Sequence, residues 1–164
     1  MPALPKPVID ALARLNAAYP WDHNSRYHGW ILRQLPARTG TALDVGSGTG
    51  DLARLLATRA DRVTGMDVDA DVVARAAAHT PDAARVAFTV GSAPDGLPAG
   101  PFDALTCVAA VHHLPFDEAL AAFRDRLAPG GTLAVVGLYR SAGPLDTLID
   151  LTAVAANPLV GLVR

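Results

Sequence analysis

Short apolar runs alternate along this chain with longer stretches in which apolar side chains recur every three or four positions. The runs have the pattern of buried strands, and the longer stretches have the pattern of amphipathic helices. The expected strands cover residues 41–45, 62–67, 86–90, 102–108 and 132–138. Because strands that alternate with helices are joined by right-handed crossovers, they form a parallel sheet, and their nearly continuous apolar character indicates helices on both of its faces.

The expected helices cover residues 7–18, about 24–35, 51–60, 70–79, 116–127 and 144–156. Asp22 or Asn24 can cap the second of them and Asp69 the fourth, because their side-chain oxygens accept the free N–H groups at a helix start. The run Ala93–Pro101, with three prolines and two glycines, is expected to be a loop. Pro129-Gly130-Gly131 is expected to end the helix before the last strand.

The composition is that of a globular protein, with 51% hydrophobic residues, 18% charged residues and a formal net charge of −2. This charge indicates no basic surface, so nucleic acid is not an expected partner. Cys107 is the one cysteine and lies in an apolar run, so no disulfide framework is expected and a cytoplasmic location fits. No stretch approaches the roughly 18 uninterrupted apolar residues of a membrane span. We expect no metal site.

Residues 43–50, Leu-Asp-Val-Gly-Ser-Gly-Thr-Gly, carry the strongest chemical signal. The first expected strand runs into three glycines at alternate positions, Gly46, Gly48 and Gly50, and an apolar helix pattern follows at once. Because glycine lacks a Cβ, the turn can be tight and a ligand can approach its backbone closely. Free N–H groups at the helix start favour the polar end of a ligand, so the turn indicates a nucleoside-bearing ligand at the carboxyl end of the sheet.

Two acidic side chains lie near this turn in the expected sheet. Asp67 ends the second strand, where a carboxylate can accept both hydroxyls of a ribose; the alternative role is a helix cap, for which Asp69 is better placed. Asp44 lies inside the first strand, and a buried carboxylate needs a partner. A ligand ammonium and the turn's own N–H groups are equally good partners for Asp44, and both interpretations stay open.

The glycine spacing differs from the dinucleotide pattern G-x-G-x-x-G, because the third glycine comes one residue early and Asp51 takes the expected place. A negative side chain at this helix start opposes a pyrophosphate. The spacing therefore favours a nucleoside without bridging phosphates and argues against a nicotinamide-dependent reductase.

With these motifs in order, the chain resembles the class I S-adenosylmethionine-dependent methyltransferases over roughly residues 20–140. Residues 43–50 match the family's first motif, and 65–69 match the acidic end of its second strand. Residues 102–108 followed by His112-His113-Leu114 match the fourth-strand motif, and 127–133 match the motif that enters the fifth strand. The resemblance implies a three-layer αβα, doubly wound, mostly parallel sheet with strand order 3-2-1-4-5. It also implies methyl transfer from S-adenosylmethionine to a small-molecule acceptor by in-line displacement.

The resemblance assigns cofactor contacts to individual positions. They are Arg26, Tyr27, Asp44, Gly46, Ser47, Gly48, Gly50, Asp67, Val68, Ser92, Ala93 and Val108. In this assignment the turn lies against the methionine part of the cofactor, Asp67 binds the ribose and Val68 packs on the adenine. Ser92 stands where the family often has an acid, and its hydroxyl can still reach the adenine edge. Arg26 and Tyr27 are candidates for contact with the cofactor carboxylate.

The chemistry asks little of side chains, since the sulfonium methyl is already electrophilic and the enzyme mainly aligns the reacting atoms and excludes water. A base is needed only for an acceptor proton of high pKa, and a neutral histidine suits that task. The candidate bases are His23, His28, His112 and His113. For the last two, the alternative is hydrogen bonding to backbone at a helix start. Trp21, Tyr27 and the first two histidines form either a lid over the site or the packing face of an amphipathic helix.

The family sheet usually ends in an antiparallel hairpin of two further strands, for which the 26 residues after Leu138 leave no room. Within a single domain over 1–164 we therefore expect a helical cap over 1–38, a cofactor-binding core over 39–138 and a C-terminal helix or tail over 139–164. An uncovered fifth strand invites pairing with another copy, so a homo-oligomer through this edge is one expectation. The short C-terminus also keeps a second hypothesis open, a non-catalytic S-adenosylmethionine-binding or interaction module. A reductase that uses NAD(P) is the third.

Overall fold

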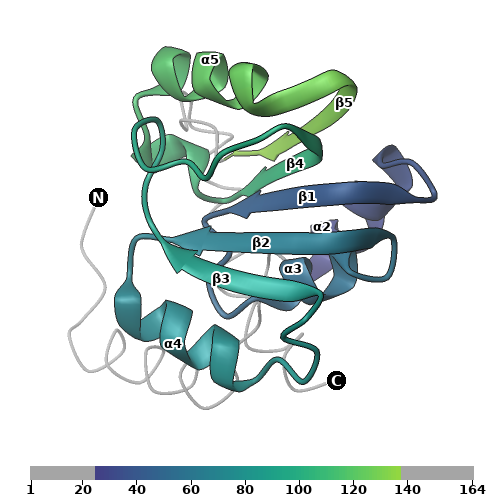
Figure 1. The fold of residues 1–164 in the computed structure, drawn as a ribbon. Helices are drawn as coiled ribbons and strands as arrows, with labels where there is room; N and C mark the ends of the chain where they lie inside the picture. The colour runs from purple at the N-terminus through teal and green to yellow at the C-terminus, as the bar shows by residue number, and fades with distance from the viewer. Residues whose placement is uncertain (1–24, 138–164) are drawn as a thin grey trace, which may run out of the picture. The chain divides into compact units, whose positions relative to one another are not determined.

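The computed structural model describes residues 25–137 as a five-stranded sheet with helices packed on it. The strands are β1 (Thr39–Val45), β2 (Ala60–Asp67), β3 (Val86–Val90), β4 (Phe102–Val108) and β5 (Leu127–Val136). The helices are α2 (Ser25–Gln34), α3 (Asp51–Leu56), α4 (Ala70–Ala78), the 3-10 helix η1 (Val111–His113) and α5 (Phe116–Arg126). The strands lie in the order β3-β2-β1-β4-β5, and all neighbouring pairs are parallel (Figure 1). The expected strand order and doubly wound topology are confirmed.

Alternation along the strands divides the core between two faces of the sheet. On one face Ala42 and Ala104 pack with side chains from α2 and α3, among which Ile31 is fully buried. On the other face Leu43 and Leu105 pack with Phe123 of α5. Because successive strand residues point to opposite faces, continuous apolar strands supply both layers at once. The result is a three-layer arrangement with β1 at its centre.

The switch in chain direction at β1 creates the place for a site. From β1 the chain winds outward through β2 to β3 and then returns to the other side of β1 to form β4. The carboxyl ends of β1 and β4 are therefore adjacent, while the connections that leave them run to opposite faces of the sheet. Such a switch point opens a crevice outside the strand ends, where open α/β sheets bind ligands.

Several element boundaries differ from those expected. The helix expected over 51–60 ends at Leu56, because the chain must turn back to start β2 at Ala60. The fifth strand begins at Leu127 rather than Thr132. Its register with β4 shifts between Leu127 and Thr132, and Gly130 has a φ of +79° inside this irregular stretch. The two glycines therefore lie in an irregular stretch within β5, and they do not separate the helix from the strand as expected.

The remaining expected elements either agree with the observed ones or fall outside the residues that the structure describes. The expected helix near 24–35, the strand over 86–90 and the strand over 102–108 are confirmed. His112 and His113 lie in η1 and not in α5. The helices expected over 7–18 and 144–156 fall outside the described residues, so the division into cap, core and tail stays a prediction. Within 25–137 no helix is both long and apolar enough to cross a membrane.

Candidate functional site

A cavity of about 390 Å³ lies at the carboxyl ends of the four adjacent strands β3, β2, β1 and β4. It is lined by Val45, Gly46, Met66, Asp67, Val68, Gly91, Ser92, Ala93, Ala109, Ala110, His113 and Leu114. Most of these residues end β1 and β2 or directly follow β1, β2, β3 and β4, and His113 and Leu114 come from the end of η1, so the cavity occupies the switch point of the sheet. Its volume falls within the roughly 300–1,000 Å³ of small-molecule sites.

The glycine turn forms one wall of this cavity through Gly46. The backbone N–H groups of Gly46 and Ser47 both donate to the carbonyl of Met66, at 2.8 and 2.9 Å, so the turn is tied to the end of β2. Gly46 has a φ of +72°, and a Cβ at this position would lie 2.3 Å from the Cβ of Ala110. Only glycine fits this close approach between the chain segments that follow β1 and β4. Ser47, Gly48 and Gly50 belong to the same turn but do not line the cavity.

Asp67 joins the turn to β2 and also faces the cavity. Its Oδ2 accepts the backbone N–H of Gly48 at 2.9 Å, and its Oδ1 accepts that of Asp69 at 3.1 Å. The cap of α4 is formed by Asp69, whose carboxylate accepts the N–H groups of Asp71 and Val72. The assignment of the cap to Asp69 is confirmed. Because a carboxylate offers about four lone-pair sites, Asp67 retains capacity for the hydroxyls of a ligand.

Asp44 is buried next to the cavity, with only 2% of its surface exposed. Thr106 Oγ1 donates to Asp44 Oδ1 at 2.6 Å. Burial raises the pKa of Asp44 to about 7; the hydrogen bond from Thr106 opposes this rise, and the negative charge of Asp67 adds to it. The turn's own N–H group at Gly48 goes to Asp67 instead, so the protein partner of Asp44 is a hydroxyl on β4.

Sequence reasoning missed Thr106, although a signal for it exists. Thr106 is the residue of β4 that lies opposite Asp44 in the parallel register. Once β1 and β4 are placed side by side, a hydroxyl residue in an otherwise apolar strand is a natural partner for a buried acid. Ala109 and Ala110 were missed too, and their position directly after β4 was the available signal.

Other predicted cofactor residues divide between those that line the cavity and those that do not. Val68, Ser92 and Ala93 line it, and Val68 is 73% exposed. Val108 is buried one residue before Ala109 and does not line it. The hydroxyl of Ser47 is buried without a hydrogen-bond partner among the described residues, and it lies beside Gly65 of β2.

The candidate histidines also differ in whether they line the cavity. His113 lines the cavity, and the ring of His112 lies against it with centroids 4.0 Å apart. His28 is buried on α2, and its charge acts on Asp51 at the start of α3. Burial raises the pKa of Asp51, but hydrogen bonds from Arg54 and Thr49 together with the positive charges of Arg54 and His28 hold that pKa below its usual range. His113 is therefore the candidate base that the fold brings to the cavity.

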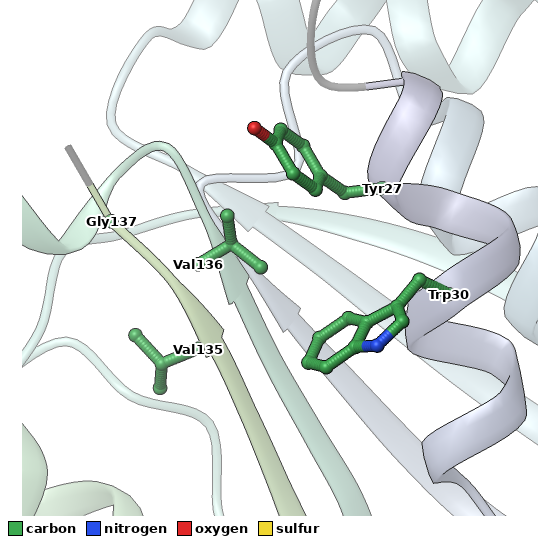
Figure 2. A pocket seen from close by; sticks show the side chains of 5 residues that line it. All are labelled: Tyr27, Trp30, Val135, Val136 and Gly137. Atoms are coloured by element: carbon green, nitrogen blue, oxygen red, sulfur yellow. The ribbon is translucent and has the colours of Figure 1, made fainter.

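The N-terminal candidates lie apart from this cavity or outside the description. Tyr27 lines a second cavity, between α2 and β5, together with Trp30 (Figure 2). The side chain of Arg26 and the whole of Trp21 and His23 lie outside the described residues. In the described part of the chain, no group of three or more His, Cys, Asp or Glu side chains is arranged to hold a metal ion.

Comparison with known proteins places this site in a family. A family model described as a methyltransferase domain matches residues 42–131. The chain is 38% identical over 118 residues to an uncharacterized methyltransferase of Mycobacterium tuberculosis, covering 71% of this chain and 60% of that protein. It is 35% identical over 122 residues to trans-aconitate 2-methyltransferase of Streptomyces avermitilis, covering 69% of this chain and 45% of that protein. The chain thus spans about half of the length of these curated relatives.

A solved structure gives the same result for the fold. The chain is similar to CalS10 from Micromonospora echinaspora, an amino pentose methyltransferase solved with SAM bound, with a TM-score of 0.63 and 28% identity. That similarity covers 85% of this chain and 59% of the other. The matched family segment runs from β1 through the irregular start of β5 and so contains the glycine turn, Asp67 and His113. The chain belongs to the methyltransferase domain family, and its resemblance to the class I S-adenosylmethionine-dependent methyltransferases is confirmed.

Proposed function

We propose that this chain binds S-adenosylmethionine in the cavity at the strand ends and transfers its methyl group to a small-molecule acceptor. The observation that carries the proposal is the meeting of Gly46, Asp67, Val68 and Ser92 around one cavity, although they come from three different strand ends. Family membership and the SAM-bound state of the similar CalS10 structure support the choice of cofactor.

The described residues suit the parts of this cofactor. The free lone pairs of Asp67 would accept the ribose hydroxyls, and the exposed side chain of Val68 offers an apolar surface for the adenine. Ser92 and Ala93 bound the same end of the cavity, while the backbone at Gly46 leaves room for the methionine part. Buried Asp44 would add negative charge near a positively charged ligand.

The bound cofactor supplies an electrophilic methyl group on a sulfonium. The protein's contribution is to hold acceptor and cofactor in line and to keep water out. Where the acceptor atom carries a proton of high pKa, His113 is placed to accept it, since it lines the cavity and His28 does not. Asp51 in the first turn of α3 would repel a pyrophosphate, which disfavours a dinucleotide in this cavity.

Calorimetric titration with S-adenosylmethionine and with S-adenosylhomocysteine tests the cofactor half of the proposal. We expect both to bind, and an absence of binding at high micromolar concentration would refute it. A panel of small-molecule acceptors with labelled S-adenosylmethionine tests the transfer half. Cofactor binding without transfer to any acceptor would favour a non-catalytic binding module instead.

A cytoplasmic location and self-association through β5 belong to the same proposal. In the described sheet β5 is an outer strand, so its free edge can pair with a second copy. Sedimentation at several protein concentrations measures this association, and a monomer at all of them would contradict it.

A further inference from the structure

A second cavity, of about 700 Å³, lies between α2 and the carboxyl end of β5. Its described lining is Tyr27, Trp30, Val135, Val136 and Gly137. Figure 2 shows the rings of Tyr27 and Trp30 projecting from α2 toward Val136 of β5, while the side chain of Val135 points away from them. The function proposed above makes no use of this space.

Packing of α2 on the sheet leaves both rings partly exposed. Tyr27 and Trp30 are three residues apart on α2 and so lie on neighbouring positions of one face. Each keeps 46% of its surface exposed, whereas Ile31 on the same helix is fully buried in the core. Ile31 and, directly after the helix, Leu35 pack in the core and hold α2 on the sheet, while the aromatic pair stays nearly half exposed.

One backbone hydrogen bond connects the lining of this cavity to the lining of the proposed cofactor site. The N–H of Ala109 donates to the carbonyl of Val136 at 2.7 Å. Ala109 lines the first cavity, and Val136 lines the second. Ala109 also has a φ of +54°, a conformation that costs a non-glycine residue free energy and is typically kept at functional sites. A molecule in the second cavity therefore lies next to the strand end that bounds the first.

We propose that the cavity between α2 and β5 binds the methyl acceptor, and that this acceptor is an uncharged aromatic molecule. The proposal rests on the function proposed above. The aromatic faces of Tyr27 and Trp30 would stack on the acceptor ring, and Val136, on the same face of the sheet as α2, would cover its other side. The hydroxyl of Tyr27 and the indole N–H of Trp30 are the polar groups that the described lining offers.

Charge decides between acceptor classes. The five described lining residues include no Lys, Arg, Asp or Glu. A carboxylate that entered this cavity would lose its water without gaining a cationic partner from them, and that loss is costly. When a neutral ring binds, the surface that it removes from water is mainly apolar, and the burial of apolar surface is favourable. The class of acceptor expected is therefore a neutral phenol or similar ring, not a polycarboxylate.

The test uses 2-naphthol and 2-naphthoate, two probes of the same ring system that differ in charge at neutral pH. Each is titrated by calorimetry into the whole chain saturated with S-adenosylhomocysteine. We expect 2-naphthol to bind at least about tenfold more tightly than 2-naphthoate. Equal affinities, or tighter binding of 2-naphthoate, would overturn the proposal.

Substitutions locate the probe. Trp30→Leu and Tyr27→Leu should each weaken 2-naphthol binding at least about fivefold, while Phe116→Leu should leave it unchanged. Phe116 is the matched control, since it is a 55% exposed aromatic at the start of α5 and lines neither cavity. Affinity for S-adenosylhomocysteine reports whether each variant is folded. An unaltered 2-naphthol affinity in both cavity variants would contradict the assignment.

The two proposals fail in different ways. If S-adenosylhomocysteine does not bind, the proposed function is wrong, and the probe titration without it still tests the cavity. If S-adenosylhomocysteine binds and the cavity variants bind 2-naphthol as the wild type does, the acceptor site is wrong while the cofactor site stands.

Discussion

The Asp67 carboxylate accepts the backbone N–H of Gly48 at 2.9 Å, and so one side chain at the end of β2 holds the turn that follows β1. The contact joins the two motifs from which the cofactor site was predicted. It also means that Asp67 has a structural role before any ligand arrives. A test of its ligand role must therefore separate lost binding from a disturbed turn.

Replacing Asp67 with Ala should weaken binding of S-adenosylmethionine by roughly 1–3 kcal/mol, because a half-buried acceptor for the ribose hydroxyls is lost. Calorimetry gives the affinity, and chemical denaturation gives the free energy of unfolding. Asp69→Ala is the matched control on the next turn of chain. It removes the cap of α4 and should lower stability by about 0.5–2 kcal/mol without changing cofactor affinity. Equal affinity losses in both variants would contradict a specific role for Asp67.

Two glycines of the turn should respond differently to alanine. At Gly46 the new Cβ would lie 2.3 Å from that of Ala110, and φ is +72°, so overpacking and backbone strain add to about 2–5 kcal/mol. At Gly48 no heavy atom lies within 4 Å of the new Cβ, and only strain of about 1–2 kcal/mol remains at a φ of +52°. Urea denaturation of Gly46→Ala and Gly48→Ala measures both losses. A larger loss at Gly48 would contradict the described turn.

The topology was predictable because its signals are local and repeat along the chain. Each strand of residues 41–108 is a short apolar run between helix caps and breakers, and the one rule of right-handed crossovers orders them. The start of β5 was not predictable in this way. Gly130 and Gly131 are usual between elements, but here β4 supplies hydrogen-bonding partners that extend the strand back to Leu127. Tertiary pairing overrode the local turn signal.

Site residues that belong to a sequence motif could be predicted. Contacts that depend on how separate segments pack together could not. Gly46, Asp67, Val68 and Ser92 were expected from motifs and do line one cavity. The pairing of Thr106 with Asp44 requires the register of β1 with β4, which no single segment carries. The same holds for His28, whose position on α2 is predictable but whose approach to Asp51 is a product of helix packing.

Thr106→Val should destabilise the fold by about 1–3 kcal/mol despite the similar shape of the two side chains. The hydroxyl that donates to Asp44 at 2.6 Å is lost, and among the described residues no other side chain donates a hydrogen bond to this buried carboxyl. Thermal or urea denaturation measures the change. In the double variant Thr106→Val with Asp44→Leu the penalty of Thr106→Val should shrink, since no polar group is left without a partner. Additive losses would argue against coupling of the two side chains.

Asp44 should also give the fold a characteristic dependence on pH. Burial raises its pKa from 3.8 to about 7, so between these values the folded state holds a proton that the unfolded state releases. The stabilising contribution is thus complete below about pH 4 and is lost as the pH rises through 7. One proton gives a slope of at most about 1.4 kcal/mol per pH unit. Asp44→Asn cannot titrate, so the difference in unfolding free energy between wild type and variant should decrease over this range.

The lowered pKa of Asp51 changes the free energy of unfolding in the opposite direction and over a different pH range. Its contribution is present above about pH 4 and is lost below it, so it does not mask the effect of Asp44. Denaturant melts of wild type and Asp44→Asn at half-unit steps from pH 4 to 8 give the difference directly. A constant difference over that range would show that Asp44 is ionised throughout and that Thr106 outweighs burial. With S-adenosylmethionine bound, the positive ligand favours the ionised carboxyl, so the wild-type dependence should move to lower pH.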